Sequence, residues 1–256
     1  MLNYVKSEIY RVTHSWGIYV LTFCFAAVPL FFNLMLYGFE RFTPDFPYAT
    51  TSFSYSNIVA NPMIFCLAAL CLVFVLYEGN KKNGNLKNVV AFGISREKIF
   101  AGEFMVCLIA SVFVLVITAA VYILSASLLL KKEGAVEVTD FINEILSVSP
   151  VAVFALLLAI FAVLLFEKSF TGFIFWYGIL FLIPQILFYI GFKVKPIQEI
   201  AMWMPCNFFG TMEVNQQVCA PIWDTVKGLA TCFISGIAGM GVFGILGVTV
   251  LRKKEF

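Results

Sequence analysis

Six long apolar runs constrain this chain more than any other feature of its sequence. They cover residues 16–37, 58–77, 104–130, 148–166, 170–192 and 228–251. A helix needs about 20 residues to cross a bilayer core about 30 Å thick. The composition agrees, because 61% of the 256 residues are hydrophobic and 12% are charged, whereas soluble domains carry about 25% charged residues. We therefore predict an all-α integral membrane protein with six transmembrane helices, a single transmembrane domain over residues 1–256.

The placement of Lys and Arg predicts the orientation. If the first residues are cytoplasmic, eleven of the 17 Lys and Arg residues lie inside and the other six outside. Basic residues favour cytoplasmic loops, so we expect a multi-pass protein of the cell membrane with both termini in the cytoplasm. The net charge of +2 gives no reason to expect a nucleic-acid partner. The outer loops then hold Glu133, Glu137, Asp140 and Glu144, and no acidic residue lies well inside a span, which disfavours a proton relay.

Residues 1–15 form an amphipathic segment before the first span. Its apolar positions make one stripe of a helix: Leu2, Val5, Ile9, Val12 and Trp16. Such a helix is expected to lie along the inner leaflet, in contact with membrane lipid. His14, the only histidine, falls off this stripe and is assigned no chemistry.

A basic inner stretch, residues 84–98, separates the second and third runs. Leu86, Val89, Val90 and Gly93 have helical spacing, so they form one stripe of a short helix. Asn85 can begin that helix and Gly93 can end it. Ser95 then caps a second helix. The pattern predicts a shaped docking surface; the alternative is a loop whose charge only fixes the orientation.

The same stretch lacks a nucleotide site. Gly79 and Gly84 have the spacing of a phosphate-binding loop, but Asn85 and Leu86 follow where Lys and then Ser or Thr are required. We find no catalytic residues and no set of side chains with metal-ligand spacing. The chain is therefore expected to be no enzyme and to hold no cofactor of its own.

The stretch also resembles a known family. Its residues Gly84, Leu86, Lys87, Asn88, Gly93, Ile94, Ser95 and Arg96 are similar to the loop between spans two and three of type-2 ATP-binding-cassette transporter permeases, the six-span membrane subunits of bacterial exporters. The amphipathic first helix, the six spans and the long outer loop at 193–227 agree with that family. Glu103 departs from it, since a basic residue is frequent there.

The resemblance implies a coupling helix that sits in a groove of a separate ATPase. Two cytoplasmic ATPase subunits would bind ATP and Mg, and a second permease copy or paralogue would complete the assembly. The coupling residues carried over are Leu86, Lys87, Val89, Val90, Gly93, Ser95 and Arg96. Cargo would move outward between the two permeases, and a hydrophobic or antimicrobial peptide is the cargo class that such small permeases often export.

The outer loop, residues 193–227, contains an unusually apolar segment, EIAMWMPCNFFG. The resemblance suggests a re-entrant pair of short helices there, and aromatic anchoring at the interface is the alternative. Cys206 and Cys219 lie thirteen positions apart in this loop. They form either an extracellular disulfide or two free thiols, because spacing alone does not fix geometry.

Span five carries Pro184 and Gln185 near its middle. An amide there should face protein or a wet cavity, since an unpaired amide in lipid is costly. Gln185 either bonds a neighbouring helix or contacts cargo. The other candidates for a substrate path are aromatic residues of spans one and two: Phe25, Phe31, Phe32 and Phe65.

Two other functional classes stay open on the sequence alone. One is a membrane-embedded enzyme, which would need a nucleophile, base or metal that we do not find. The other is a non-transporting scaffold or sensor. An ATPase partner would distinguish the permease from both.

Overall fold

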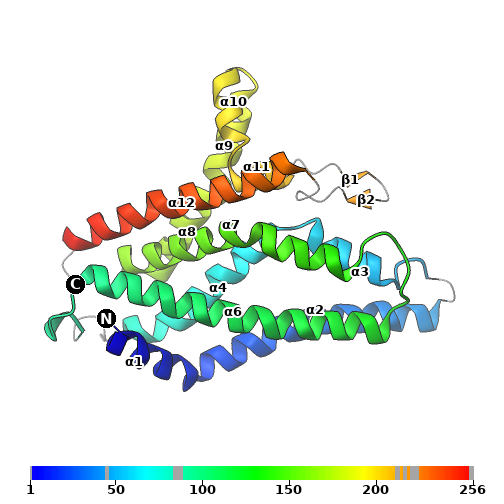
Figure 1. Ribbon diagram of the computed structural model, residues 1–256, viewed down its shortest axis with the longest axis horizontal. Coiled ribbons are helices and arrows are strands. Elements are labelled where there is room, and N and C mark those ends of the chain that lie inside the picture. Colours follow the sequence, from blue (N-terminus) through cyan, green and yellow to red (C-terminus); the bar gives the residue numbers. More distant parts are fainter. Residues whose placement is uncertain are drawn as a thin grey trace.

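The computed structural model is an assembly of long helices (Figure 1). It describes residues 2–43, 46–82, 89–210, 214–215, 218–219 and 225–253. The helices, in chain order, are α1 (Leu2–Thr13), α2 (Trp16–Phe42), α3 (Thr51–Val59), α4 (Met63–Lys82), α6 (Arg96–Leu129), α7 (Val138–Leu165), α8 (Ser169–Tyr177), the π-helical turn η1 (Gly178–Leu182), α9 (Ile183–Gly191), α10 (Lys195–Ala201), α11 (Pro205–Gly210) and α12 (Val226–Lys253). Two short antiparallel strands, β1 (Val214–Asn215) and β2 (Val218–Cys219), pair between α11 and α12.

Five helical segments of the described chain are long and apolar enough to cross a membrane. They are α2, α6, α7, the α8–η1–α9 segment and α12. The bent pair α3–α4 supplies a sixth when it is counted as one span. The fold is therefore that of an all-α integral membrane protein, as the apolar runs predict.

The second span differs from the straight helix expected at 58–77. The α3 and α4 axes meet at 71°, with Ala60 to Pro62 between the two helices. Pro62 has no backbone N–H and disfavours helical geometry at the residue before it. Asn61 stabilises the break by donating its side-chain amide to the Asn57 carbonyl, 2.8 Å away.

Two other helices begin earlier than their apolar runs. α6 begins at Arg96 rather than near 104, and α7 begins at Val138 rather than near 148. Asp140 accepts a 2.8 Å hydrogen bond from the backbone N–H of Glu137, which stabilises the start of α7. The prediction that Glu144 lies in an outer loop is therefore wrong, since it belongs to α7 and is fully buried.

Helix α7 is the centre of the molecule. Its most apolar window is 72% buried, whereas the windows of the other four single spans are only 17–22% buried. α4, α6, α8 and α12 pack around it. Trp176 of α8 is completely buried there and donates its indole N–H to the Ala155 carbonyl at 2.9 Å. The other spans show most of their apolar surface outward, as lipid-facing helices do.

A buried polar network ties α3 to its neighbours. Asn33 of α2 donates to the Ser125 hydroxyl of α6 at 2.8 Å and accepts from the Ser54 hydroxyl of α3 at 2.7 Å. The Tyr122 hydroxyl donates to the Ser54 carbonyl at 2.6 Å. The four residues are almost completely inaccessible, so their mutual pairing removes the penalty of burying polar groups.

Candidate functional site: the end of the bundle near α1

Residues 89–95 form a tight bend that leads into α6, at the end of the bundle where α1 begins and α12 finishes (Figure 1). Residues 89–91 are helical. The Gly93 N–H donates to the Val90 carbonyl at 2.9 Å, and the Ile94 N–H donates to the Val89 carbonyl at 3.4 Å. Gly93 has φ +82°. These two bonds and a left-handed glycine make a Schellman motif, so Gly93 ends the short helix.

The predicted docking stripe is only partly described by the structure. Val89 and Val90 are half-buried. Leu86, Lys87 and the proposed cap Asn85 lie outside the described residues. Phe92, which the spacing argument passed over, is 86% exposed beside the bend. The sequence signal that could have identified Phe92 is its place as an aromatic residue directly before the Gly-Ile-Ser-Arg turn.

Ser95 occupies the N-cap position of α6 with extended backbone angles, φ −65° and ψ 145°. Its side chain accepts no capping hydrogen bond, which differs from the expected cap. Glu97 lies in the first turn of α6, where a carboxylate is favourable to the helix dipole. The start of α6 is therefore stabilised by Glu97 rather than by Ser95.

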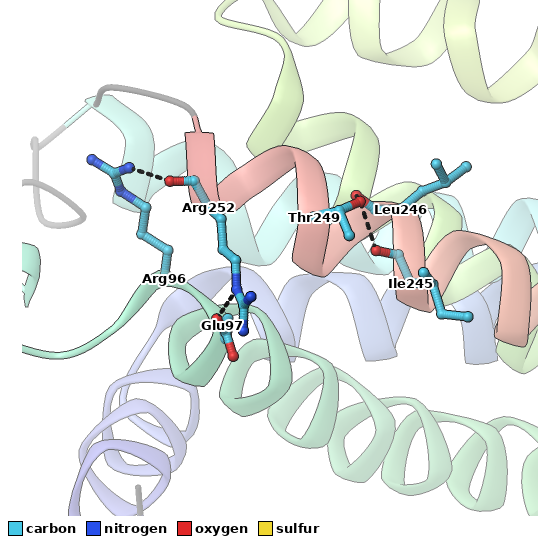
Figure 2. Close-up of polar contacts among 6 residues, drawn as sticks. All are labelled: Arg96, Glu97, Ile245, Leu246, Thr249 and Arg252. Carbon is cyan, nitrogen blue, oxygen red and sulfur yellow. Dashed lines mark hydrogen bonds and ion pairs between the residues drawn. The ribbon is translucent and has the colours of Figure 1, made fainter.

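Arg96 and Glu97 also bind the last turn of α12 (Figure 2). The Arg96 guanidinium donates to the backbone carbonyl of Arg252 at 2.9 Å, and the Arg252 guanidinium pairs with the Glu97 carboxylate. Arg96 thereby satisfies a carbonyl that the helix end leaves without an intrahelical partner. We call these three residues the Arg252 clamp. The clamp connects the bend to the final helix. Local sequence spacing gives no sign of it, because Glu97 and Arg252 are 155 positions apart.

Helix α1 is attached to α6 close to the same bend. The Tyr4 hydroxyl donates to the buried carboxylate of Glu103 at 2.5 Å. A Cβ added at Gly102 would lie 2.7 Å from the Tyr4 ring, so the two helices touch there. Burial and the adjacent Glu103 carboxylate raise the pKa of Tyr4, and its phenol stays protonated as a donor. Glu103, the residue that departs from the family pattern, is therefore an attachment point for α1.

The apolar stripe of α1 faces protein over most of its length. Val12 is 5% exposed, and Val5 and Ile9 pack against the main hydrophobic core. Trp16 is different, because it begins α2 and is 80% exposed. Arg11 pairs with Glu8 at 2.7 Å and also donates to the Leu76 carbonyl of α4 at 3.4 Å. α1 is thus bound to both helices that lead to the bend.

The kink expected at Pro184 takes the form of a π-helical turn. The wide turn η1 comes directly before α9, and Pro184 falls in the first turn of α9. Asn207 of α11 donates to the Pro184 carbonyl and to the Ala201 carbonyl, each at 2.8 Å. Asn207 was not singled out from the sequence, because its partner is 23 positions away.

The apolar outer segment contains the short helices α10 and α11. Phe208 and Phe209 of α11 belong to the main core, while α10 stands out from the bundle (Figure 1). Cys206 is half-buried, and burial raises the pKa of its thiol. The side chain of Cys219 lies outside the described part of the chain, so a bridge between the two cysteines stays a prediction.

The predicted substrate-path residues do not line one cavity within a single chain. Gln185 is exposed on α9, and Phe31 is 64% exposed on α2. The other three aromatic residues, Phe25, Phe32 and Phe65, are half-buried against the hydrophobic cores. α2 and α9 lie on opposite sides of the bundle in Figure 1. The residues remain candidates for a path that a second chain would complete.

The family described as "ABC-2 family transporter protein" matches residues 4–185, which include most of α1, the bend and Gln185. No curated protein matches the chain.

Proposed function

Because the chain belongs to the ABC-2 transporter family, we propose that it is the permease subunit of an exporter driven by a separate ATPase. Two ATPase subunits supply the energy by binding ATP and Mg, so the chemistry belongs to the partner. A second permease, either a copy of this chain or a paralogue, completes the complex in the cell membrane. In this arrangement both termini and the bend are cytoplasmic.

One observation supports the proposal more than any other. The bend is closed by the Schellman motif at Gly93, and the Arg252 clamp connects it to α12. A segment held in this way transmits a push from a docked ATPase to α6 and α12 together, whereas a loose loop would absorb it. Val89, Val90 and the exposed Phe92 are the apolar groups that the ATPase groove would cover.

Co-purification tests the docking surface. The full chain is produced with its partner ATPase, and Val89 and Val90 are both changed to Asp. We expect the ATPase to be lost from the purified complex while the chain still inserts in the membrane, because two carboxylates cannot be buried in an apolar groove without a partner. Phe92→Ala should weaken the complex less, since the side chain is removed without adding charge.

Lys168→Asp is the matched control. It places a new carboxylate at an exposed position between α7 and α8, on the same side of the membrane in the proposed orientation. We expect it to retain the ATPase. If the Val89→Asp/Val90→Asp chain still co-purifies with ATPase, docking occurs elsewhere and the coupling role of the bend is wrong.

For cargo we propose a hydrophobic or antimicrobial peptide that moves between the two permeases. Gln185 and Phe31 are exposed in the single chain, so a second chain can cover them. Phe25, Phe32 and Phe65 are half-buried, and their side chains would add weak, non-directional contacts that favour release.

Gln185→Leu distinguishes a cargo contact from a contact between helices. If Gln185 contacts cargo, peptide-stimulated ATP hydrolysis should shift while the melting temperature stays constant. If it bonds the partner permease, the complex should melt earlier with unchanged cargo preference. Gln198→Leu, the same change on α10, is the control. No effect in either measurement would remove Gln185 from the mechanism.

A further inference from the structure

A small apolar groove lies where α1 turns into α2 and both contact α6. Its volume is about 170 Å³. Val12, Ile18, Val106 and Ala110 form its floor, and all four are at most 8% exposed. An apolar protein cavity of about 150 Å³ can take up benzene, so the groove has room for a chain of roughly six carbons.

The groove offers a ligand almost no polar group. Thr13 and Tyr19 carry the hydroxyls in its lining, but both are already engaged. The Thr13 hydroxyl donates to the Tyr10 carbonyl at 2.9 Å, and the Tyr19 hydroxyl donates to the Thr13 carbonyl at 2.6 Å. A polar or charged ligand would lose its water here without gaining hydrogen bonds, which leaves hydrocarbon as the matching chemistry.

The rim of the groove is open to the surroundings of two membrane-length helices. Tyr19 of α2 and Ile109 and Phe113 of α6 are each about half exposed, and both helices are apolar enough to span. Trp16, 80% exposed one turn before Tyr19, is of the type that settles at the membrane–water boundary. The groove therefore opens just below that boundary, where acyl chains begin.

We propose that this groove holds an acyl chain of a phospholipid from the leaflet in which α1 lies. An acyl chain that moves from bulk lipid into the groove gains no hydrophobic free energy, because both surroundings are apolar. It is retained by close packing in a hollow that would otherwise be unfilled. The acyl chain lies against the end of α1, the start of α2 and the adjoining face of α6, and it helps to hold α1 in place. The proposal does not depend on which cargo or ATPase the protein uses.

The test uses the full chain in vesicles of phosphatidylethanolamine and phosphatidylglycerol. A small fraction of the phosphatidylglycerol carries a diazirine on its acyl chain, and labelled peptides are mapped by mass spectrometry. We expect labelling to concentrate on the groove segments of α1, α2 and α6, several-fold above the lipid-facing surface around Val116. Even labelling along the exposed faces of α2 and α6 would overturn the proposal.

Variants of the groove sharpen the result. Ala110→Leu adds three carbons to the floor and should reduce groove labelling several-fold, whereas Ala120→Leu adds them to an exposed position of the same helix and should leave it unchanged. Phe113→Ala removes one of the three rim side chains without touching the floor, so it should fold and also reduce labelling. Unchanged labelling in Phe113→Ala and in folded Ala110→Leu contradicts the proposal. The proposal is also contradicted if the lipid does not label the groove and cysteines introduced by Ile109→Cys cross-link two copies of the protein.

Discussion

At the scale of single residues, the structure depends on polar contacts that join distant parts of the chain. Tyr4 and Glu103, Asn207 and Pro184, and Asn33 and Ser54 each connect different helices. In an apolar environment such a contact matters mainly through what its loss leaves behind. A buried group without a partner keeps its full desolvation penalty.

We predict that Tyr4→Phe destabilises the protein by about 1–3 kcal/mol, because Glu103 loses its donor while remaining buried. Thermal unfolding of the purified chain, followed by intrinsic fluorescence, measures the effect. Tyr10→Phe is the matched control, since Tyr10 lies on the same helix and is 66% exposed. Equal losses in the two variants would mean that the Glu103 contact contributes nothing.

At the scale of helices, glycines decide how closely α12 approaches α7. A Cβ at Gly236 would lie 2.5 Å from the backbone carbon of Pro150, and one at Gly239 would lie 2.6 Å from the Phe154 ring. Gly244 has open space around it. The glycines of this helix therefore differ in role: some permit contact with α7, and at least one faces outward.

We predict opposite effects for two Gly→Ala changes in α12. Gly236→Ala should destabilise by about 1–3 kcal/mol, since backbone atoms of Pro150 must shift. Gly244→Ala should be neutral or stabilise by up to about 1 kcal/mol, because alanine is the better helix former. Melting temperatures of the two variants, measured in the same detergent, decide the matter. Similar destabilisation in both would contradict the packing.

The Arg252 clamp is a second contact at this scale. Arg252→Glu should place two carboxylates together and loosen the last turn of α12, seen as several-fold faster hydrogen exchange over residues 246–252. Adding Glu97→Arg should restore slow exchange by pairing the charges in reverse. If the double variant exchanges as fast as the single one, the ion pair does not hold the helix end.

The sequence predicts the elements better than their contacts. Apolar runs indicate every span, and Gly93 ends its short helix as expected. The start of α6 at Arg96 agrees with the predicted cap at Ser95. The start of α7 at Val138 was placed too late, because the polar residues Asp140 and Glu144 near its beginning do not look membrane-embedded in a hydropathy pattern. Arg252 and Asn207 could not be identified, since their partners are brought close only by the tertiary fold.

At the scale of the whole molecule, the contacts that matter for the proposed function gather at one end. The bend, α1 and the last turn of α12 all lie there (Figure 1). The opposite end carries the α6–α7 connection, where the Thr51 N–H donates to the Lys131 carbonyl at 2.9 Å. The two ends should face different compartments if α6 and α7 both cross the membrane.

We predict that single cysteines at the two ends label differently in intact cells. In a cysteine-free background, Lys132→Cys should react with a membrane-impermeant maleimide, and Lys168→Cys should react only after permeabilisation. Both side chains are exposed, so access to the compartment is the only variable. The reverse pattern would invert the proposed orientation, and labelling of both in intact cells would mean that α7 does not cross.

The central position of α7 has a consequence for biosynthesis. The ribosome delivers α7 well before α12, the helix that covers much of it. Until translation reaches residue 253, the α7 surface around Pro150 and Phe154 lacks that cover. A chain that stops before Val226 would therefore leave this surface open to chaperones and membrane proteases, and a premature stop codon there should lower the amount of protein rather than yield a weaker one.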